Sequence, residues 1–166
     1  MSSLDMFEHA QRKEEASSYL AWVEDEVIKE EYVRRFTISV GKSLRDVRIA
    51  ADHFRGYYAH ASKREHFVVC FLNTQFQVLR TEVLFVGSIA TSAVYPREVI
   101  ERVLELGAGA VMFSHNHPSG DINPSSSDRA VTRKLAKALE AIDVSVLDHI
   151  IVGGLAHFSF ADHNLL

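Results

Sequence analysis

The sequence predicts a layered domain of the α/β (α+β) class, in which a mixed β-sheet is flanked by helices. Its 166 residues, 47% of them hydrophobic, suffice for one domain with a core and are too few for two ordinary domains. Short apolar runs rich in β-branched and aromatic residues alternate with amphipathic segments, as strands and helices do. A strand expected at 110–114 follows a helical segment, and a crossover of this kind is typical of parallel strand pairs.

The chain divides into a polar beginning and a patterned remainder. Residues 1–42 are mostly polar and helix-favouring, which predicts an N-terminal helical segment on the outside of the domain formed by residues 43–166. Ser43 followed by Asp46 indicates a helix start, an N-cap with an acid three positions on. The helix that follows places one apolar stripe towards the core, formed by Val47, Ala50, Phe54, Tyr57, Tyr58 and Ala61.

Two strands are expected next. HFVVCFLN, residues 66–73, is apolar enough to be buried on both faces, and a polar turn separates it from a second strand within 76–87. The first of these runs contains Cys70, the only cysteine. A single cysteine excludes an intrachain disulfide framework and a thiolate zinc cage, so we interpret Cys70 as a buried, inert thiol.

The second half has clear start and stop signals. Pro96 opens a helix that Gly107 closes, and a short buried strand follows at 110–114. The small and polar residues after it predict a loop that begins at His115. Helical spacing returns over 125–142, and the chain ends in a hairpin within 144–160 that turns at two adjacent glycines, 153 and 154.

The loop after the strand at 110–114 carries the residues most suited to chemistry. His115 and His117 are separated by one residue, so on an extended segment both imidazoles point to one side and can bind one metal ion. Asp128 follows eleven residues after His117, beyond a turn rich in proline and glycine. Ser125 and Asp128 also have the spacing of a helix capping pair, but capping alone leaves the two histidines unexplained.

Two neutral imidazoles and one carboxylate suit Zn²⁺ in a hydrolytic site. Three protein ligands leave a fourth position on the metal for water, which then becomes a nucleophile near neutral pH. The reaction also needs a base to take the proton of that water. Glu65, just before the first strand, and Glu82, on the second, both remain candidates on residue type and position. No His-Glu-x-x-His helix or cysteine pair offers another zinc pattern.

The string HNHPSGDINPSSSD, residues 115–128, resembles the JAMM (MPN) metalloprotease motif in the spacing of its histidines, serine and aspartate. The wider text, LNTQFQVLRTEVLFVGSI followed by VYPREVIERVLELGAGAVMFSHNHPSGDINPSSSD and VLDHIIVGG, resembles the RadC-like branch of that superfamily over about residues 43–166. The chain looks like a member of this branch without the N-terminal helix-hairpin-helix module. It also carries Asn116 where the ubiquitin-cleaving isopeptidases of the superfamily usually have serine.

The resemblance implies a three-layer α/β sandwich similar to that of cytidine deaminases. It implies one Zn²⁺ per chain, held by His115, His117 and Asp128. In the motif the general base is a glutamate at the start of the strand before the hairpin, which favours Glu65 over Glu82. The serine of the motif, here Ser125, helps to hold the oxyanion.

Asp148 and His149 also match the RadC-like branch, and we give them an outer role behind the ligands, with buried structural residues as the equal alternative.

The hypothesis is therefore a zinc-dependent peptidase or isopeptidase that acts on a protein or peptide substrate. A non-catalytic, zinc-pinned binding module and a DNA-repair-associated protein are the alternatives. A net charge of -4 offers no basic field for a nucleic acid, and the sequence contains no run of apolar residues long enough for a membrane span. We expect a cytoplasmic protein; the sequence leaves a homo-oligomer open.

Overall fold

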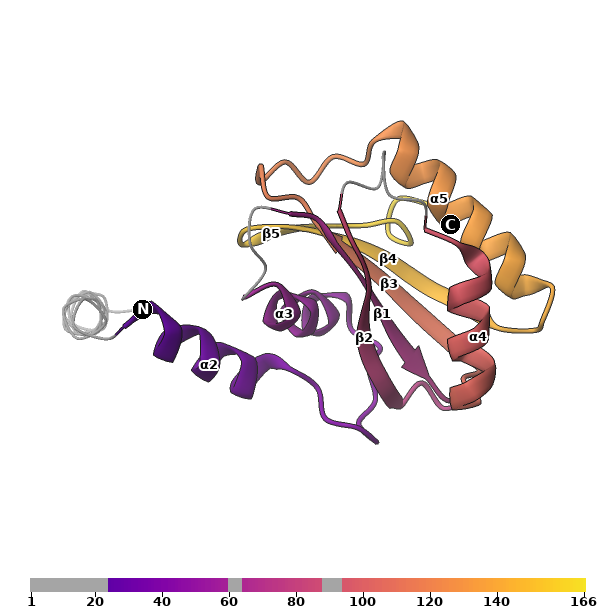
Figure 1. Ribbon diagram of the computed structural model, residues 1–166, viewed down its shortest axis with the longest axis horizontal. Helices are drawn as coiled ribbons and strands as arrows, with labels where there is room; N and C mark the ends of the chain where they lie inside the picture. Colours follow the sequence, from indigo (N-terminus) through magenta and orange to yellow (C-terminus); the bar gives the residue numbers. More distant parts are fainter. Residues whose placement is uncertain (1–23, 60–63, 88–93) are drawn as a thin grey trace, which may run out of the picture.

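The computed structural model describes residues 24–59, 64–87 and 94–166 (Figure 1). Four helices and five strands follow one another in these residues. In chain order they are α2 (Asp25–Phe36), α3 (Val47–Tyr58), β1 (His66–Leu72), β2 (Val78–Val86), α4 (Pro96–Leu106), β3 (Ala110–Asn116), α5 (Ser126–Glu140), β4 (Ser145–Gly153) and β5 (Ala156–Ser159).

The five strands form one mixed sheet in the order β2-β1-β3-β4-β5. β1 is antiparallel to β2 and to β3, β3 and β4 are parallel, and β4 is antiparallel to β5. α5 connects the parallel pair, because two parallel neighbours cannot be joined by a tight hairpin. Every residue of β3 is buried, as is every residue of β1 except the first, which agrees with their central places in the sheet. The predicted mixed sheet is confirmed.

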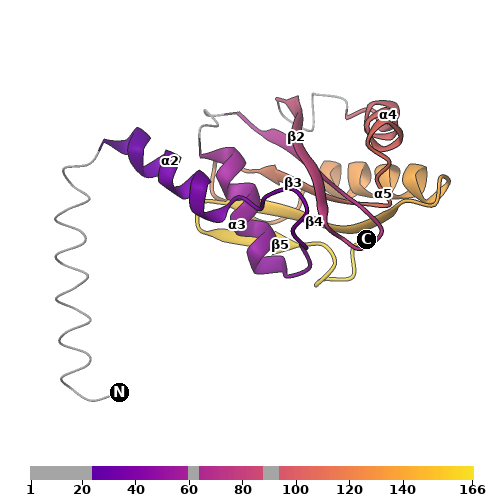
Figure 2. The ribbon, with the colours of Figure 1, turned by 90° about the horizontal axis from the view of Figure 1, so that it is seen from below.

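Helices cover both faces of the sheet and make three layers. α4 and α5 pack on one face over an apolar cluster that includes Phe67, Phe113 and Leu135. α3 packs on the other face over a second cluster that includes Phe54 and Met112. Figures 1 and 2 show α4 and α5 together on one side of the strands and α3 on the other. The predicted sandwich is therefore confirmed, and the alternation of side chains along each strand assigns each residue to one layer.

α2 lies outside these layers. It has no buried residue and packs against α3 at the edge of the domain (Figure 1). This agrees with the expected outer helix, whereas residues 1–23 of the predicted N-terminal segment lie outside the described residues. The division of the chain at residue 42 stays a prediction. Among the described helices, none has the length and apolar content needed to cross a bilayer.

Two boundary predictions are wrong. Ser43 does not cap α3: it forms an isolated bridge with Gln77, and the carboxylate of Asp46 accepts the first free N–H groups of the helix instead. The loop does not begin at His115, because β3 continues to Asn116 by pairing with β4. Local polarity indicated a loop at this point, but the pairing with β4 continues the strand there. Of the predicted apolar stripe, Ala61 lies outside the described residues.

The other boundaries agree with the signals in the sequence. Pro96 occupies the first turn of α4, and Gly107 ends the helix with a positive φ of 63°, a conformation that glycine adopts without a steric penalty. The hairpin of β4 and β5 closes the chain as expected. Cys70 is fully buried, and burial raises the pKa of its thiol to about 11, in line with an inert thiol.

Candidate metal centre

The end of β3 presents two histidines at the rim of the sheet. His115 lies within the strand and is fully buried, and His117 is the first residue after the strand. The backbone N–H of His117 still donates to the carbonyl of Val152 on β4, at 2.9 Å, so the chain remains extended through this residue. Residues two apart on an extended segment share a face. Both imidazoles therefore lie on the face of the sheet that α5 covers.

The start of α5 brings in the carboxylate. Ser125 is the N-cap of the helix, and its hydroxyl accepts from the backbone N–H of Asp128 at 3.1 Å. In return, Asp128 Oδ2 accepts from the backbone N–H of Ser125 at 2.7 Å and from its hydroxyl at 2.6 Å. The capping box holds Asp128 Oδ2 against Ser125, and this fixes the direction of the other carboxylate oxygen, Oδ1. Asp128 is 2% exposed, so the fixed oxygen points inward.

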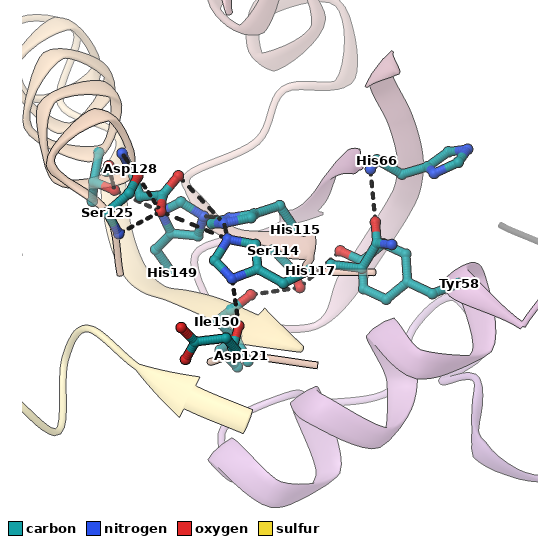
Figure 3. A network of polar contacts seen from close by, with 12 residues as sticks. Tyr58, His66, Ser114, His115, His117, Asp121, Ser125, Asp128, His149 and Ile150 are labelled. Carbon is teal, nitrogen blue, oxygen red and sulfur yellow. Dashed lines mark hydrogen bonds and ion pairs between the residues drawn. The ribbon is translucent and has the colours of Figure 1, made fainter. Parts of the chain in front are cut away.

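The three side chains converge on one point, as Figure 3 shows. His115 Nε2 lies 3.0 Å from His117 Nε2 and 3.4 Å from Asp128 Oδ1, and His117 Nε2 lies 3.7 Å from Asp128 Oδ2. Two ligand atoms, each about 2.05 Å from a tetrahedral Zn²⁺, lie about 3.3 Å apart. The separations of 3.0 Å and 3.4 Å are close to the edges of such a polyhedron, whereas the 3.7 Å contact of His117 is to the other carboxylate oxygen. Among the described residues, only this group of histidines and carboxylates is arranged so that it could hold a metal ion.

The hydrogen bonds around His117 fix its tautomer. His117 Nδ1 lies 2.5 Å from the carbonyl oxygen of Asp121, in the loop after β3. A carbonyl oxygen can only accept, so Nδ1 carries the proton. In a neutral imidazole the other nitrogen then has a lone pair, and for His117 this is Nε2, the atom that faces His115.

The tautomer of His115 follows from a longer chain of contacts. Thr132 Oγ1 donates to the carbonyl of Asp128 at 2.6 Å, which uses its only hydrogen. The same oxygen therefore accepts from His149 Nδ1 at 2.6 Å. His149 Nε2 is then an acceptor and receives the proton of His115 Nδ1 at 2.8 Å. His115 Nε2 is left with its lone pair, directed at the point of convergence.

Three lone-pair atoms thus face one another without a proton between them. Burial lowers the pKa of His115 and that of His149 well below the usual value, so neither imidazole takes up an extra proton near neutral pH. A divalent cation satisfies all three atoms at once. The residues present therefore fit Zn²⁺, with His115, His117 and Asp128 as ligands.

The loop between β3 and α5 packs closely on the end of β4. A Cβ atom at Gly153 would lie 2.5 Å from the carbonyl oxygen of Gly120, a distance that real side chains do not adopt. Glycine at position 153 therefore lets the loop reach the sheet. This close approach places Asp121 where its carbonyl can accept from His117.

The two candidate bases occupy different places. Glu65 directly precedes β1, and since Phe67 pairs with His115, antiparallel register places Glu65 opposite His117, on the same face of the sheet. Glu82 pairs with Val69 halfway along β2, an edge strand of the sheet. Its carboxylate is bound by Arg102 and by Arg80, which lower its pKa. Glu65 therefore lies at the same rim as the histidines, and Glu82 does not.

The remaining predicted residues divide between the site and the scaffold. Ser125 is bound to Asp128 in the capping box, which gives it a structural task; its oxyanion role stays a prediction. His149 contacts His115, so its position is compatible with the outer role, and that role stays a prediction. The side chain of Asp148 contacts neither His115 nor His117. Its carboxylate accepts from the hydroxyl of Ser159 and from the backbone N–H of Ala161, and these bonds hold the last residues of the chain against β4.

Thr132 is a residue that the sequence analysis missed. It lies four positions after Asp128 on α5, one turn along the same face, and contacts both Asp128 and His149. Its position in the helix was the only signal available, because nothing in the sequence pairs it with His149 on β4.

A cavity of about 690 Å³ opens beside His117. It lies between α2, α3 and the loop after β3, and its lining includes Ile28, Tyr32, Tyr58, Asn116 and Pro118. Its size is in the range of sites that bind small molecules or a few residues of a peptide. Aromatic and aliphatic side chains form much of its wall.

Comparison with known proteins places these residues in a family context. Residues 44–165 match the family model described as RadC-like JAB domain. The chain is 49% identical over 104 residues to the UPF0758 protein YfjY of Escherichia coli, which covers 63% of this chain and 65% of that protein. It is 51% identical over 104 residues to the UPF0758 protein YeeS of Escherichia coli, covering 63% of this chain and 70% of that one.

A UPF0758 protein of Aliivibrio salmonicida is 42% identical over 120 residues, which cover 70% of this chain and 54% of that protein. The chain therefore spans just under two thirds of the length of YfjY and about half of that of the Aliivibrio protein. The names of these relatives state no activity.

Proposed function

The chain belongs to the RadC-like JAB domain family, and on this premise we propose that it is a zinc-dependent hydrolase of amide bonds, a peptidase or isopeptidase. The observation that carries the proposal is the convergence of His115, His117 and Asp128, each of which offers one acceptor atom within 4.8 Å of the others, close enough to share one cation. Three protein ligands, as opposed to four, are typical of catalytic zinc sites.

The chain supplies the groups that a hydrolysis needs around this cation. Zn²⁺ bound there would polarise the scissile carbonyl and acidify an attacking water molecule. Glu65, at the rim opposite His117, accepts the proton of that water and delivers it to the leaving amine. Ser125 would supply the hydroxyl that donates to the oxygen that becomes negative; its hydrogen, which is donated to Asp128 Oδ2 in the structure, would turn to that oxygen during the reaction.

The cavity beside His117 supports a protein or peptide as the substrate. Its lining of Ile28, Tyr32, Tyr58 and Pro118 suits the side chains of an extended segment next to the scissile bond. Lys29 and Arg55 also line the cavity and offer hydrogen-bond donors to the carbonyl groups of such a segment.

The test combines metal analysis with turnover. The purified protein is reconstituted with Zn²⁺, its metal content is measured, and it is assayed against a panel of peptides and isopeptide-linked peptides. We expect one Zn²⁺ per chain and cleavage of at least one class of substrate. Glu65→Gln should keep the metal and lower kcat by about 10²–10⁴-fold, because the amide of glutamine cannot take up the proton.

Glu82→Gln is the matched control, since it alters a carboxylate on the neighbouring strand that Arg102 binds, away from the rim. We expect it to keep turnover. A protein that binds Zn²⁺ and cleaves nothing across the panel would instead favour the non-catalytic binding module. Full activity of Glu65→Gln on a confirmed substrate would exclude Glu65 as the base.

A further inference from the structure

The side chain of Asn116 binds the backbone on both sides of Glu65. Its Oδ1 accepts from the backbone N–H of His66 at 2.7 Å, a bond that Figure 3 marks at His66. Its Nδ2 donates to the carbonyl oxygen of Arg64 at 3.2 Å. Asn116 is 8% exposed, so these bonds are shielded from water. One carboxamide therefore holds the residues immediately before and after the proposed base.

The register of the sheet explains why a side chain is needed there. Phe67 pairs with His115 in the antiparallel ladder, so His66 falls opposite Asn116 and Arg64 opposite Pro118. Pro118 has no backbone N–H and cannot donate to the carbonyl of Arg64. The last rung of the ladder is therefore missing its donor, and Asn116 Nδ2 supplies one in its place.

The directions of the neighbouring backbone groups agree with this account. The carbonyl of Glu65 accepts from Gly87 at 2.8 Å, on the side of β2, so the groups of Arg64 and His66 point to the other side, towards β3. The N–H of His117 points away from β1, to Val152 on β4. Between β1 and the end of β3, the carboxamide of Asn116 thus provides two hydrogen bonds at residues 64–66.

We propose that Asn116 is a positioning residue for Glu65, which holds the start of β1 against the end of β3 so that the Glu65 carboxylate stays beside the metal ligands. This inference rests on the proposed function for the role of Glu65 and not for the contacts themselves. The same segment of chain thus has two tasks: His115 and His117 bind the cation, and the residue between them aligns the base. A displacement of about 1 Å at such a site can cost about 10²-fold in rate.

Ser114 offers a matched control on the same strand. It lies two residues before Asn116, on the same face of β3, and is fully buried. Its hydroxyl accepts from Tyr58 and donates to the carbonyl of Ile150, so its hydrogen bonds lead to α3 and β4. Ser114→Ala removes a buried polar group of the same strand without touching the start of β1.

The first experiment needs no substrate. Amide hydrogen exchange is measured for His66, together with the paramagnetic broadening that Co²⁺, added as a probe of the metal centre, causes at the side chain of Glu65. In Asn116→Ala we expect faster exchange at His66 and weaker broadening at Glu65, with both unchanged in Ser114→Ala. Asn116→Asp keeps the acceptor for His66 and loses the donor for Arg64, so it should protect the His66 amide and still weaken the broadening.

Unchanged exchange and unchanged broadening in Asn116→Ala would overturn the proposal. If Asn116→Ala does not fold, Asn116→Asp decides on the same two measurements. Should Co²⁺ not bind to the protein, the proposed function fails, and exchange at His66 still decides whether Asn116 holds this segment.

The second experiment uses whichever substrate the peptide panel identifies. Asn116→Ala should lower kcat by about 10–100-fold with little change in KM or in affinity for Zn²⁺, because it moves the base and not the ligands. In the background of Glu65→Gln the same substitution should cost nothing further, since residues that act as a unit are not additive. An equal loss in both backgrounds would show that Asn116 does not act through Glu65.

Discussion

Two buried imidazoles on opposite sides of the sheet show how a structural histidine differs from a candidate metal ligand. His53, on the α3 face, and His115, on the α5 face, are both fully buried. His53 Nδ1 accepts from the N–H of Ile38 at 2.7 Å, and its Nε2 lies 2.9 Å from Thr81 Oγ1. Both of its nitrogens therefore have partners of the right kind. At His115 only Nδ1 has such a partner, and Nε2 faces the acceptor atoms of His117 and Asp128.

Burial alone does not distinguish the two residues. It lowers the pKa of His53 to about 4 and that of His115 in the same direction, so both are neutral near pH 7. The distinguishing feature is the arrangement of lone pairs around each ring. A group of acceptors that face one another in a buried site is suited to a cation, whereas an imidazole with both nitrogens hydrogen-bonded is not.

The largest effect should come from removing the carboxylate ligand. Asp128→Ala leaves two imidazoles, so the affinity for Zn²⁺ should fall by more than the factor of about 10–100 that outer partners of a ligand typically contribute. A competition titration with a chromogenic chelator measures this affinity. Glu140→Ala, at the exposed end of the same helix, is the control and should bind as the wild type does. Unchanged affinity in Asp128→Ala would remove the basis of the comparison.

Lowering the pH should reduce the free energy of unfolding through the structural histidine, His53. Since the pKa of His53 is lowered to about 4, the unfolded chain takes up a proton near pH 6.5 before the native state does. The contribution of the neutral His53 imidazole to the free energy of unfolding is fully present above pH 6.5 and is lost as the pH falls towards 4, a change on the order of 3 kcal/mol. His53→Leu should make the free energy of unfolding, measured in urea at pH 7 and pH 4, correspondingly less dependent on pH.

The same variant sharpens the comparison at neutral pH. His53→Leu leaves the N–H of Ile38 unpaired, which should lower the free energy of unfolding by about 1–3 kcal/mol. Its affinity for Zn²⁺ should stay as in the wild type. A loss of metal binding in this variant would mean that the two faces of the sheet are coupled.

A smaller effect on the metal centre is expected from its outer partner. His149→Phe keeps a ring stacked on Phe160 and removes the acceptor for His115 Nδ1, so the affinity for Zn²⁺ should fall by about 10–100-fold. Thr132→Val acts one step further along the chain of contacts and should have a weaker effect in the same direction. Calorimetric titration with Zn²⁺ measures both. Equal affinity in His149→Phe and the wild type would show that the tautomer of His115 is fixed without this contact.

The sequence was sufficient to predict the layers and the three side chains of the candidate metal centre. Apolar runs rich in β-branched and aromatic residues predicted the strands, and helical spacing predicted the helices. The spacing of His115, His117 and Asp128 predicted their convergence, because all three lie close together in the chain around one strand-loop-helix unit. Signals in the local sequence are enough to predict a unit of this kind. The base could be narrowed only to Glu65 and Glu82 from the residues themselves, and a resemblance was needed to choose between them.

Tertiary structure decided the features that depend on register. Pairing with β4 carried β3 through Asn116, where local polarity had indicated a loop. The contact of His149 with His115, and the bonds of Asn116 around Glu65, join residues that lie 34 to 52 positions apart. A one-residue shift in strand pairing would send each of these side chains to the opposite face. The amino acids at 115–128 thus determine which atoms can bind a cation, and the alignment of the strands determines which residues stand behind them.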